Sequence, residues 1–206
     1  SHLKDGAAPR AHPGPFPTMS RLIIRGGNRI AGMHRAPGNK NAALPMLTAA
    51  LLTDETVTLD NLPIIDDVKT TLLQLEKLGV DVTLDSAARR VSLRAGKLKS
   101  TCLDRTLCAK VRSAILFAGP LLGRCGRATI CQPGGDLIGR RRVDTHINGL
   151  RALGASVTPR NGYAFRSRGL AGAHILLDEC SVTATENLVM AAVLAKGRTT
   201  LYHAAC

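Results

Sequence analysis

The chain has 206 residues, a formal net charge of +13 and 45% hydrophobic residues, whereas aromatic residues make up only 2% and Trp is absent. This length suits one sizeable domain or two small ones, with a core built from aliphatic side chains. The positive charge fits anionic substrates, but the few aromatics argue against a binder of single-stranded nucleic acid, and no apolar run approaches the roughly 18 residues of a membrane helix. We therefore expect a soluble, cytoplasmic protein that binds neither nucleic acid nor membrane.

The chain opens with a segment that lacks hydrophobic periodicity. Residues 1–18 carry four prolines and are predicted to be a disordered leader or an expression remnant, so that residues 19–206 form the folded domain. The six cysteines contain no C-x-x-C spacing, which argues against a zinc site. We interpret them as reduced thiols, and their roles stay open.

An internal repeat organises the rest of the chain. Residues 43–84 and 114–158 show the same order of features: an apolar helix ending in Leu-Leu, a β-branched strand, an amphipathic helix ending in Leu-Gly, and an alternating strand. A further strand closes each unit, at residues 89–95 and at 162–168. Glycine after Leu is typical of a helix C-terminus, and Asn161-Gly162 is typical of a hairpin.

A third copy begins at residues 173–179, continues through a helix within 183–197 and ends with a strand at 198–204. The units cover about 21–95, 96–168 and 169–206, and each follows a β-α-β-α-β-β order that the third does not complete. A truncated repeat could be a natural cap. We favour a missing remainder, because no polar capping helix follows the last strand.

The two helices of each unit differ in character. The first is apolar on nearly every side, as in "AILFAGPLL", which is typical of a helix buried all round. The second is amphipathic, and Val68, Leu72, Leu75 and Leu78 share one face. The predicted fold class is α/β (α+β), an inside-out α/β prism with pseudo-threefold symmetry. Three buried helices form its centre, and sheets and amphipathic helices pack outside.

Four ordered motifs carry a resemblance to a known family: "GNKNAALPML" at residues 38–47, "VRSAILFAGPLLGR" at 111–124, "PGGDLIGRRRVDTHINGLRALGA" at 133–155 and "SVTATEN" at 181–187. Over residues 21–206 the sequence resembles the enolpyruvyl transferases, and among them the branch that acts on UDP-N-acetylglucosamine. The sister branch, the EPSP synthases, has Ser after the lysine, where Asn41 stands here, and lacks the PGG loop.

The resemblance implies transfer of the enolpyruvyl group of phosphoenolpyruvate to the 3-hydroxyl of UDP-N-acetylglucosamine through a tetrahedral ketal. This is the first committed step of peptidoglycan synthesis, which links the family to cell-wall growth and cell division. The reaction needs no metal and no organic cofactor. Family members are about twice as long and hold their substrates between two globes, so the resemblance also implies a missing C-terminal half or a second chain.

Lys40 and Arg112 each stand at the start of an apolar helix. A helix N-terminus with a lysine suits phosphate, although an exposed lysine before a helix is common. An arginine entering an apolar helix needs an anionic partner or a path to water. The resemblance assigns Lys40 to phosphoenolpyruvate, with a catalytic role, Asn41 to the sugar nucleotide, and Arg112 to the substrate anions.

Asp136 stands where most family members have a cysteine that donates a proton to the vinyl carbon. A lone Asp in a Gly-rich turn is more often a polar loop tip. A proton donor must hold its proton at working pH, and free Asp titrates near pH ~3.9. Our hypothesis is that bound phosphoenolpyruvate raises the pKa of Asp136, which then protonates C3. Because fosfomycin alkylates the family cysteine, the carboxylate also implies insensitivity to fosfomycin.

The remaining candidate residues follow from the same comparison. The resemblance assigns Arg141 to substrate anions, and Arg142, Val143 and Asp144 to the uridine nucleotide, although position 142 is usually proline. It places Ser181, Val182 and Thr183 at the diphosphate; the residues alone also predict an N-cap here, with a capping-box spacing from Thr183 to Glu186. His146 has a family counterpart near the site, but a lone helix histidine is more often structural.

Two alternative functions stay open from the sequence. One is an enolpyruvyl transferase acting on another nucleotide in secondary metabolism, which Arg142 and the unusual "MHRAPGNKN" lead-in would allow. The other is a non-catalytic nucleotide-binding or scaffold protein. The joint presence of Lys40, Arg112, Asp136 and Arg141 argues against a scaffold.

Overall fold

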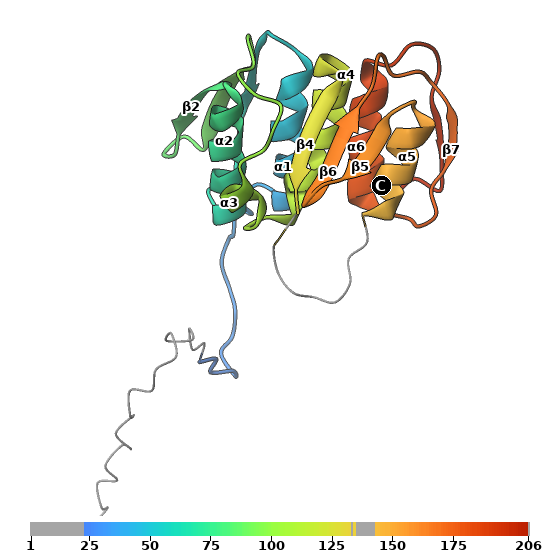
Figure 1. Cartoon of the computed structure of the whole chain (residues 1–206). Coiled ribbons are helices and arrows are strands. Elements are labelled where there is room, and N and C mark those ends of the chain that lie inside the picture. Colours follow the sequence, from blue (N-terminus) through green and yellow to red (C-terminus); the bar gives the residue numbers. More distant parts are fainter. Residues whose placement is uncertain (1–22, 133, 135–142, 206) are drawn as a thin grey trace, which may run out of the picture. The chain divides into compact units, whose positions relative to one another are not determined.

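The computed structural model describes residues 23–132, 134 and 143–205 (Figure 1). The chain consists of two compact units, residues 1–35 and 36–206. In the first unit, residues 23–35 are exposed and form neither helix nor strand. The predicted β-α-β-α-β-β order is therefore wrong at this point: no strand opens the first repeat within residues 23–35, and its first described element is the apolar helix. All elements below belong to the second unit.

The first repeat contains two helices and an antiparallel sheet. Its elements are α1 (Lys40–Ala49), a 3₁₀ turn η1 (Ala50–Leu52), β1 (Thr56–Leu59), α2 (Asp66–Leu78), β2 (Asp81–Asp85) and β3 (Arg90–Arg94). The strand order is β1-β3-β2. Gly79 ends α2 with a φ of 98°, as its Leu-Gly signal predicts. The predicted face of α2, formed by Val68, Leu72, Leu75 and Leu78, is buried.

The second repeat has the same order, with one addition. A short helix, α3 (Arg105–Cys108), precedes η2 (Arg112–Phe117), which continues into α4 (Ala118–Cys125). The elements β4 (Arg127–Cys131), α5 (Asp144–Ala152), β5 (Ser156–Pro159) and β6 (Gly162–Arg166) follow, and the strand order is β4-β6-β5. The predicted hairpin turn is confirmed: Asn161 and Gly162 both have positive φ, at 43° and 128°.

The third repeat is reduced to β7 (His174–Leu176), α6 (Val182–Val193) and β8 (Thr200–Tyr202), with β7 and β8 paired in parallel. In Figure 1, α1, α4 and α6 stand side by side, and the β4–β6–β5 sheet lies against α4. The inside-out arrangement predicted from the repeat is the one observed.

The prediction that all three central helices are buried all round is only partly right. Residues 114–122 are buried without interruption, but α6 exposes Val189, Val193 and Leu194 along one side, and Val193 is 62% exposed. Helix α1 also exposes an apolar side chain, Met46, at 47%.

Two polar contacts fix the centre. The Arg124 guanidinium donates to the carbonyls of Leu51 and Thr53 at 3.0 and 2.8 Å and to Gly96 at 2.8 Å, which satisfies the end of η1. Between α4 and α6, the Asn187 side chain accepts from the Gly119 N–H at 2.8 Å and donates to the Ile115 carbonyl at 3.1 Å. No described helix is both long and apolar enough to cross a membrane.

Replacing Gly119 tests how closely α4 and α6 must approach. A Cβ at this position would lie 2.3 Å from the backbone oxygen of Asn187, a clash that only movement of the helix backbone can relieve. We expect Gly119→Ala to lower the free energy of unfolding by about 2–3 kcal/mol, measured by urea denaturation.

Gly96→Ala is the matched control, because a Cβ on Gly96 meets nothing within 4 Å. It should leave the unfolding midpoint nearly unchanged. Equal stability of the two variants would mean that the helices separate at no cost.

Candidate anion-binding site

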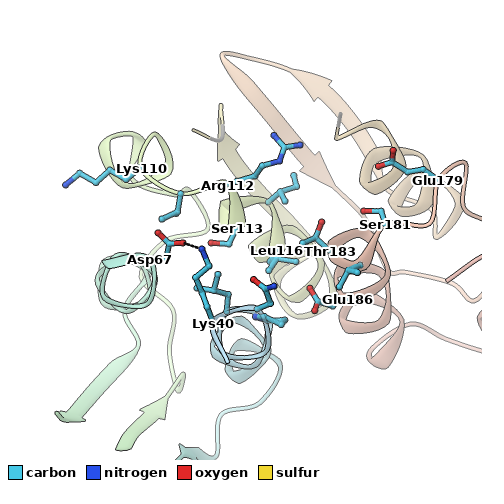
Figure 2. A pocket seen from close by; sticks show the side chains of 16 residues that line it. Lys40, Asp67, Lys110, Arg112, Ser113, Leu116, Glu179, Ser181, Thr183 and Glu186 are labelled. Atoms are coloured by element: carbon cyan, nitrogen blue, oxygen red, sulfur yellow. Dashed lines mark hydrogen bonds and ion pairs between the residues drawn. The ribbon is translucent and has the colours of Figure 1, made fainter. Parts of the chain in front are cut away.

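The starts of the three central helices meet at one cavity of about 550 Å³. Lys40 begins α1, Arg112 begins η2, and Val182 begins α6, and all three residues line the cavity. Figure 2 shows Lys40 and Arg112 there. Helix starts present unpaired N–H groups and the positive end of the helix dipole. Three of them around one space favour an anionic ligand.

The start of α1 is held by its own cap. The Asn39 carboxamide accepts from the N–H groups of Asn41 and Ala42 at 2.7 and 3.2 Å. Lys40 therefore leaves the helix start in a fixed direction, and its ammonium group donates to Asp67 at 2.9 Å, as the dashed line in Figure 2 shows. Both side chains keep substantial exposure, 49% and 38%, so an incoming anion can reach the lysine.

The second wall comes from residues 110–116. Lys110, Arg112 and Ser113 line the cavity there, although Figure 2 shows the Lys110 side chain pointing outward. The Ser113 hydroxyl is buried and has no hydrogen-bond partner among the described residues. A buried hydroxyl without a protein partner is a candidate to hydrogen-bond a ligand.

The third wall is the first turn of α6. Ser181 is the N-cap, and its hydroxyl accepts from the Ala184 N–H at 3.3 Å. The predicted capping box from Thr183 to Glu186 is wrong, because Thr183 already lies inside the helix and its hydroxyl contacts His146 instead. Burial raises the pKa of the Glu186 carboxyl.

His146 lies behind Thr183 and is only 3% exposed. Its ring contacts Thr183 Oγ1 through Nε2 at 3.3 Å and Asn187 Nδ2 through Nδ1 at 3.1 Å. Burial, together with the nearby charge of Arg112, lowers the pKa of His146 from 6.5 to about 4. The imidazole is therefore neutral at physiological pH.

The structure brings together six of the site residues predicted from the sequence. Lining the same cavity are Lys40, Asn41, Arg112, Ser181, Val182 and Thr183. Val143 instead belongs to the core and Asp144 starts α5, so neither lines this cavity, and their nucleotide-binding role stays a prediction. Asp136, Arg141 and Arg142 lie outside the described residues.

Sequence reasoning missed several lining residues: Asp67, Lys110, Ser113, Glu179 and Glu186. The sequence did not indicate Asp67 as a site residue, because the helix dipole already explains an acidic residue in the first turn of α2. Only the fold places it against Lys40 from the neighbouring helix. No group of three or more His, Cys, Asp or Glu within the described ranges could hold a metal ion.

Comparison with known proteins identifies the family of the chain. The sequence model for EPSP synthase (3-phosphoshikimate 1-carboxyvinyltransferase) matches residues 24–206. The UDP-N-acetylglucosamine 1-carboxyvinyltransferases of Bradyrhizobium diazoefficiens and Rhodospirillum centenum are each 47% identical to the chain, over 90% and 91% of its length. The chain spans less than half of these relatives, 43% and 46%.

Solved structures show the same fold. The enolpyruvyl transferase NikO from Streptomyces tendae superposes with a TM-score of 0.71 over 85% of this chain and 41% of its own, at 19% identity. An EPSP synthase from Acinetobacter baumannii superposes with a TM-score of 0.66 over 82% of this chain and 40% of its own, at 19% identity. The fold and the sequence match thus place this domain in the enolpyruvyl (carboxyvinyl) transferase family. The chain belongs to the EPSP synthase family, and the fold class and family predicted from the sequence are confirmed.

The buried His146 predicts an acid-sensitive fold. In the unfolded chain the imidazole takes up a proton below about pH 6.5, but in the folded chain only near 4. Stability is therefore fully present above pH 6.5 and is lost as the pH falls toward 4, by about 3 kcal/mol at most. We expect His146→Gln to remove this part of the acid destabilisation in urea titrations at about pH 7 and about pH 4.5.

Other groups also titrate over this range, so the comparison is between variants. His174→Gln serves as the control, because His174 is exposed on β7. This variant should lose as much stability on acidification as the parent chain does. If His146→Gln and the parent chain lose the same stability on acidification, His146 is not buried in its neutral form.

Proposed function

We propose that this chain is the part of a UDP-N-acetylglucosamine 1-carboxyvinyltransferase that holds the anionic groups of phosphoenolpyruvate and the sugar nucleotide. The observation that carries the proposal is the meeting of three helix starts, with Lys40 and Arg112, around one cavity. The names of relatives 43–47% identical to the chain support the acceptor. Peptidoglycan synthesis, the link to cell division and a cytoplasmic location follow from this proposal as predictions.

In the proposed reaction, Lys40 binds the phosphate of phosphoenolpyruvate and exchanges its contact with Asp67 for one with the substrate. The acceptor 3-hydroxyl gives up its proton to a base on the complementary half of the enzyme as its oxygen bonds to C2, and Asp136 gives its own proton to C3, which produces the tetrahedral ketal. Loss of phosphate with return of a proton from C3 then restores the enol ether. The protein contributes position and charge, so the proposed chemistry requires no organic cofactor or metal.

The proposal includes a complementary polypeptide that completes the enzyme. Supporting it are large apolar side chains that the third repeat leaves exposed, Leu176, Val189, Val193, Leu194 and Tyr202. Exposed apolar side chains that adjoin one another are typical of an interface. The cavity also opens to solvent on one side, and closing it would exclude water from the reaction.

The direct test supplies the complementary half from the Rhodospirillum centenum relative. We expect phosphate release from phosphoenolpyruvate only when both polypeptides and UDP-N-acetylglucosamine are present. Lys40→Ala should reduce the rate by at least about 100-fold, because it removes the charge that holds the phosphate. Gly96→Ala, which changes a residue away from the cavity, should leave the rate of phosphate release unchanged.

Phosphate release with another uridine nucleotide only would instead identify an enzyme of secondary metabolism. Calorimetric titration separates the remaining cases. Binding of the sugar nucleotide without turnover would favour a binding protein, and the absence of binding in every combination would contradict the proposal.

Asp136 makes a separate prediction about inhibition. In the completed enzyme with UDP-N-acetylglucosamine bound, fosfomycin should leave the intact mass of the chain unchanged, since a carboxylate is a weaker nucleophile than a thiolate. Asp136→Cys should acquire the mass of one inhibitor molecule, and Asp136→Asn should lose turnover because the amide has no acidic proton to donate.

The cysteine variant is the internal control, because it shows that the inhibitor reaches the position. Labelling of the parent chain at Asp136 would contradict the predicted insensitivity. Full turnover by Asp136→Asn would contradict the proton-donor role.

A further inference from the structure

A series of linked hydrogen bonds leads from the buried backbone at the centre of the fold to the wall of the cavity. It starts at the carbonyl of Ile115 and the N–H of Gly119, passes through Asn187 and His146, and ends at Thr183. Asn187 is fully buried and His146 nearly so. Thr183 lines the cavity, as Figure 2 shows.

The donor and acceptor roles along this series of hydrogen bonds are determined by the backbone groups at its buried end. The Gly119 N–H can only donate, so it must face the amide oxygen of Asn187, at 2.8 Å. The Ile115 carbonyl can only accept, so it must face the amide nitrogen, at 3.1 Å. These two backbone partners leave a single orientation for the carboxamide.

The same amide nitrogen has a second proton, which is directed at Nδ1 of His146 at 3.1 Å. Nδ1 must therefore accept, and a neutral imidazole then carries its proton on Nε2. Nε2 lies 3.3 Å from Thr183 Oγ1. The histidine consequently donates to the threonine, and the threonine proton is left to point elsewhere.

We propose that His146 is a positioning residue that makes the Thr183 hydroxyl a hydrogen-bond donor to an oxygen atom of the bound nucleotide. The identity of that ligand rests on the proposed function. Without His146, the hydroxyl could turn its own proton toward the protein and offer the ligand only lone pairs. Lone pairs repel a phosphate or carbonyl oxygen, whereas a donor attracts it.

Two substitutions of His146 separate the halves of its role. An asparagine keeps an acceptor near the Nδ1 position for Asn187 but is too short to reach Thr183. A glutamine can place an amide N–H near the Nε2 position and still donate to Thr183. We expect His146→Asn to weaken binding of UDP-N-acetylglucosamine about tenfold, and His146→Gln to stay within about threefold of the parent chain.

Substitutions of Thr183, alone and combined with His146→Asn, complete a double-mutant cycle. Thr183→Val should weaken binding about tenfold, Thr183→Ser should not, and His146→Asn combined with Thr183→Val should bind no more weakly than either single variant. Additive losses, or a loss with glutamine but not with asparagine, would overturn the proposal and give His146 a purely structural role. Affinity is measured by calorimetry on the chain with its complementary half.

A measurement without ligand distinguishes this proposal from the proposed function. Imidazole ¹⁵N NMR at about pH 7 should show His146 neutral and protonated on Nε2, with a signal that shifts in Thr183→Val. Thr199→Val is the control, because the buried Thr199 hydroxyl has no partner among the described residues.

A proton on Nδ1, or no response to Thr183→Val, would overturn the positioning role whatever the ligand. If the parent chain binds no uridine nucleotide, the proposed function fails instead. The NMR result then still decides whether His146 sets the direction of the Thr183 hydroxyl.

Discussion

The side-chain amide of Asn187 sets how closely the second and third central helices approach. Its two backbone partners on η2 and α4 are buried, so the amide must satisfy both or leave polar groups without partners in the core. Glycine at position 119 is the residue that allows the contact, because any Cβ there would overlap the Asn187 backbone. The spacing of α4 and α6 is thus fixed by a polar requirement as well as by apolar packing, and the third wall of the cavity is positioned by it.

The same packing places the helix starts at the cavity. Central helices that are apolar along their length present few side-chain charges to the interior, but the first N–H groups of each helix have no carbonyl partner within the helix itself. The fold gathers three such starts on one side and adds Lys40 and Arg112. It also adds Asp67, Glu179 and Glu186, so the side chains alone do not make the cavity strongly cationic. The anion binding that we propose depends on the backbone as much as on the lysine and arginine.

Repeat spacing and helix periodicity were sufficient to predict the architecture, because both are local properties of the sequence. The buried face of α2, the Leu-Gly helix end at Gly79 and the hairpin at Asn161-Gly162 were all predicted and are all observed. What the sequence could not supply were contacts between elements. The pairing of Lys40 with Asp67 joins residues 27 apart, and the role of Thr183 depends on His146, 37 residues away. A capping-box pattern at Thr183 was wrong for the same reason, since Ser181 satisfies the helix start and leaves the threonine to the histidine.

A buried neutral histidine carries a cost at low pH that the fold could avoid with an apolar residue of similar size. An apolar residue, however, would leave the second proton of the Asn187 amide without an acceptor, and buried donors without partners destabilise a fold. It would also leave the Thr183 hydroxyl free to rotate. One residue type that both accepts from an amide and donates to a hydroxyl in a fixed geometry is the neutral imidazole. The predicted acid sensitivity of the fold and the proposed direction of the hydroxyl in the cavity wall therefore both follow from the same side chain.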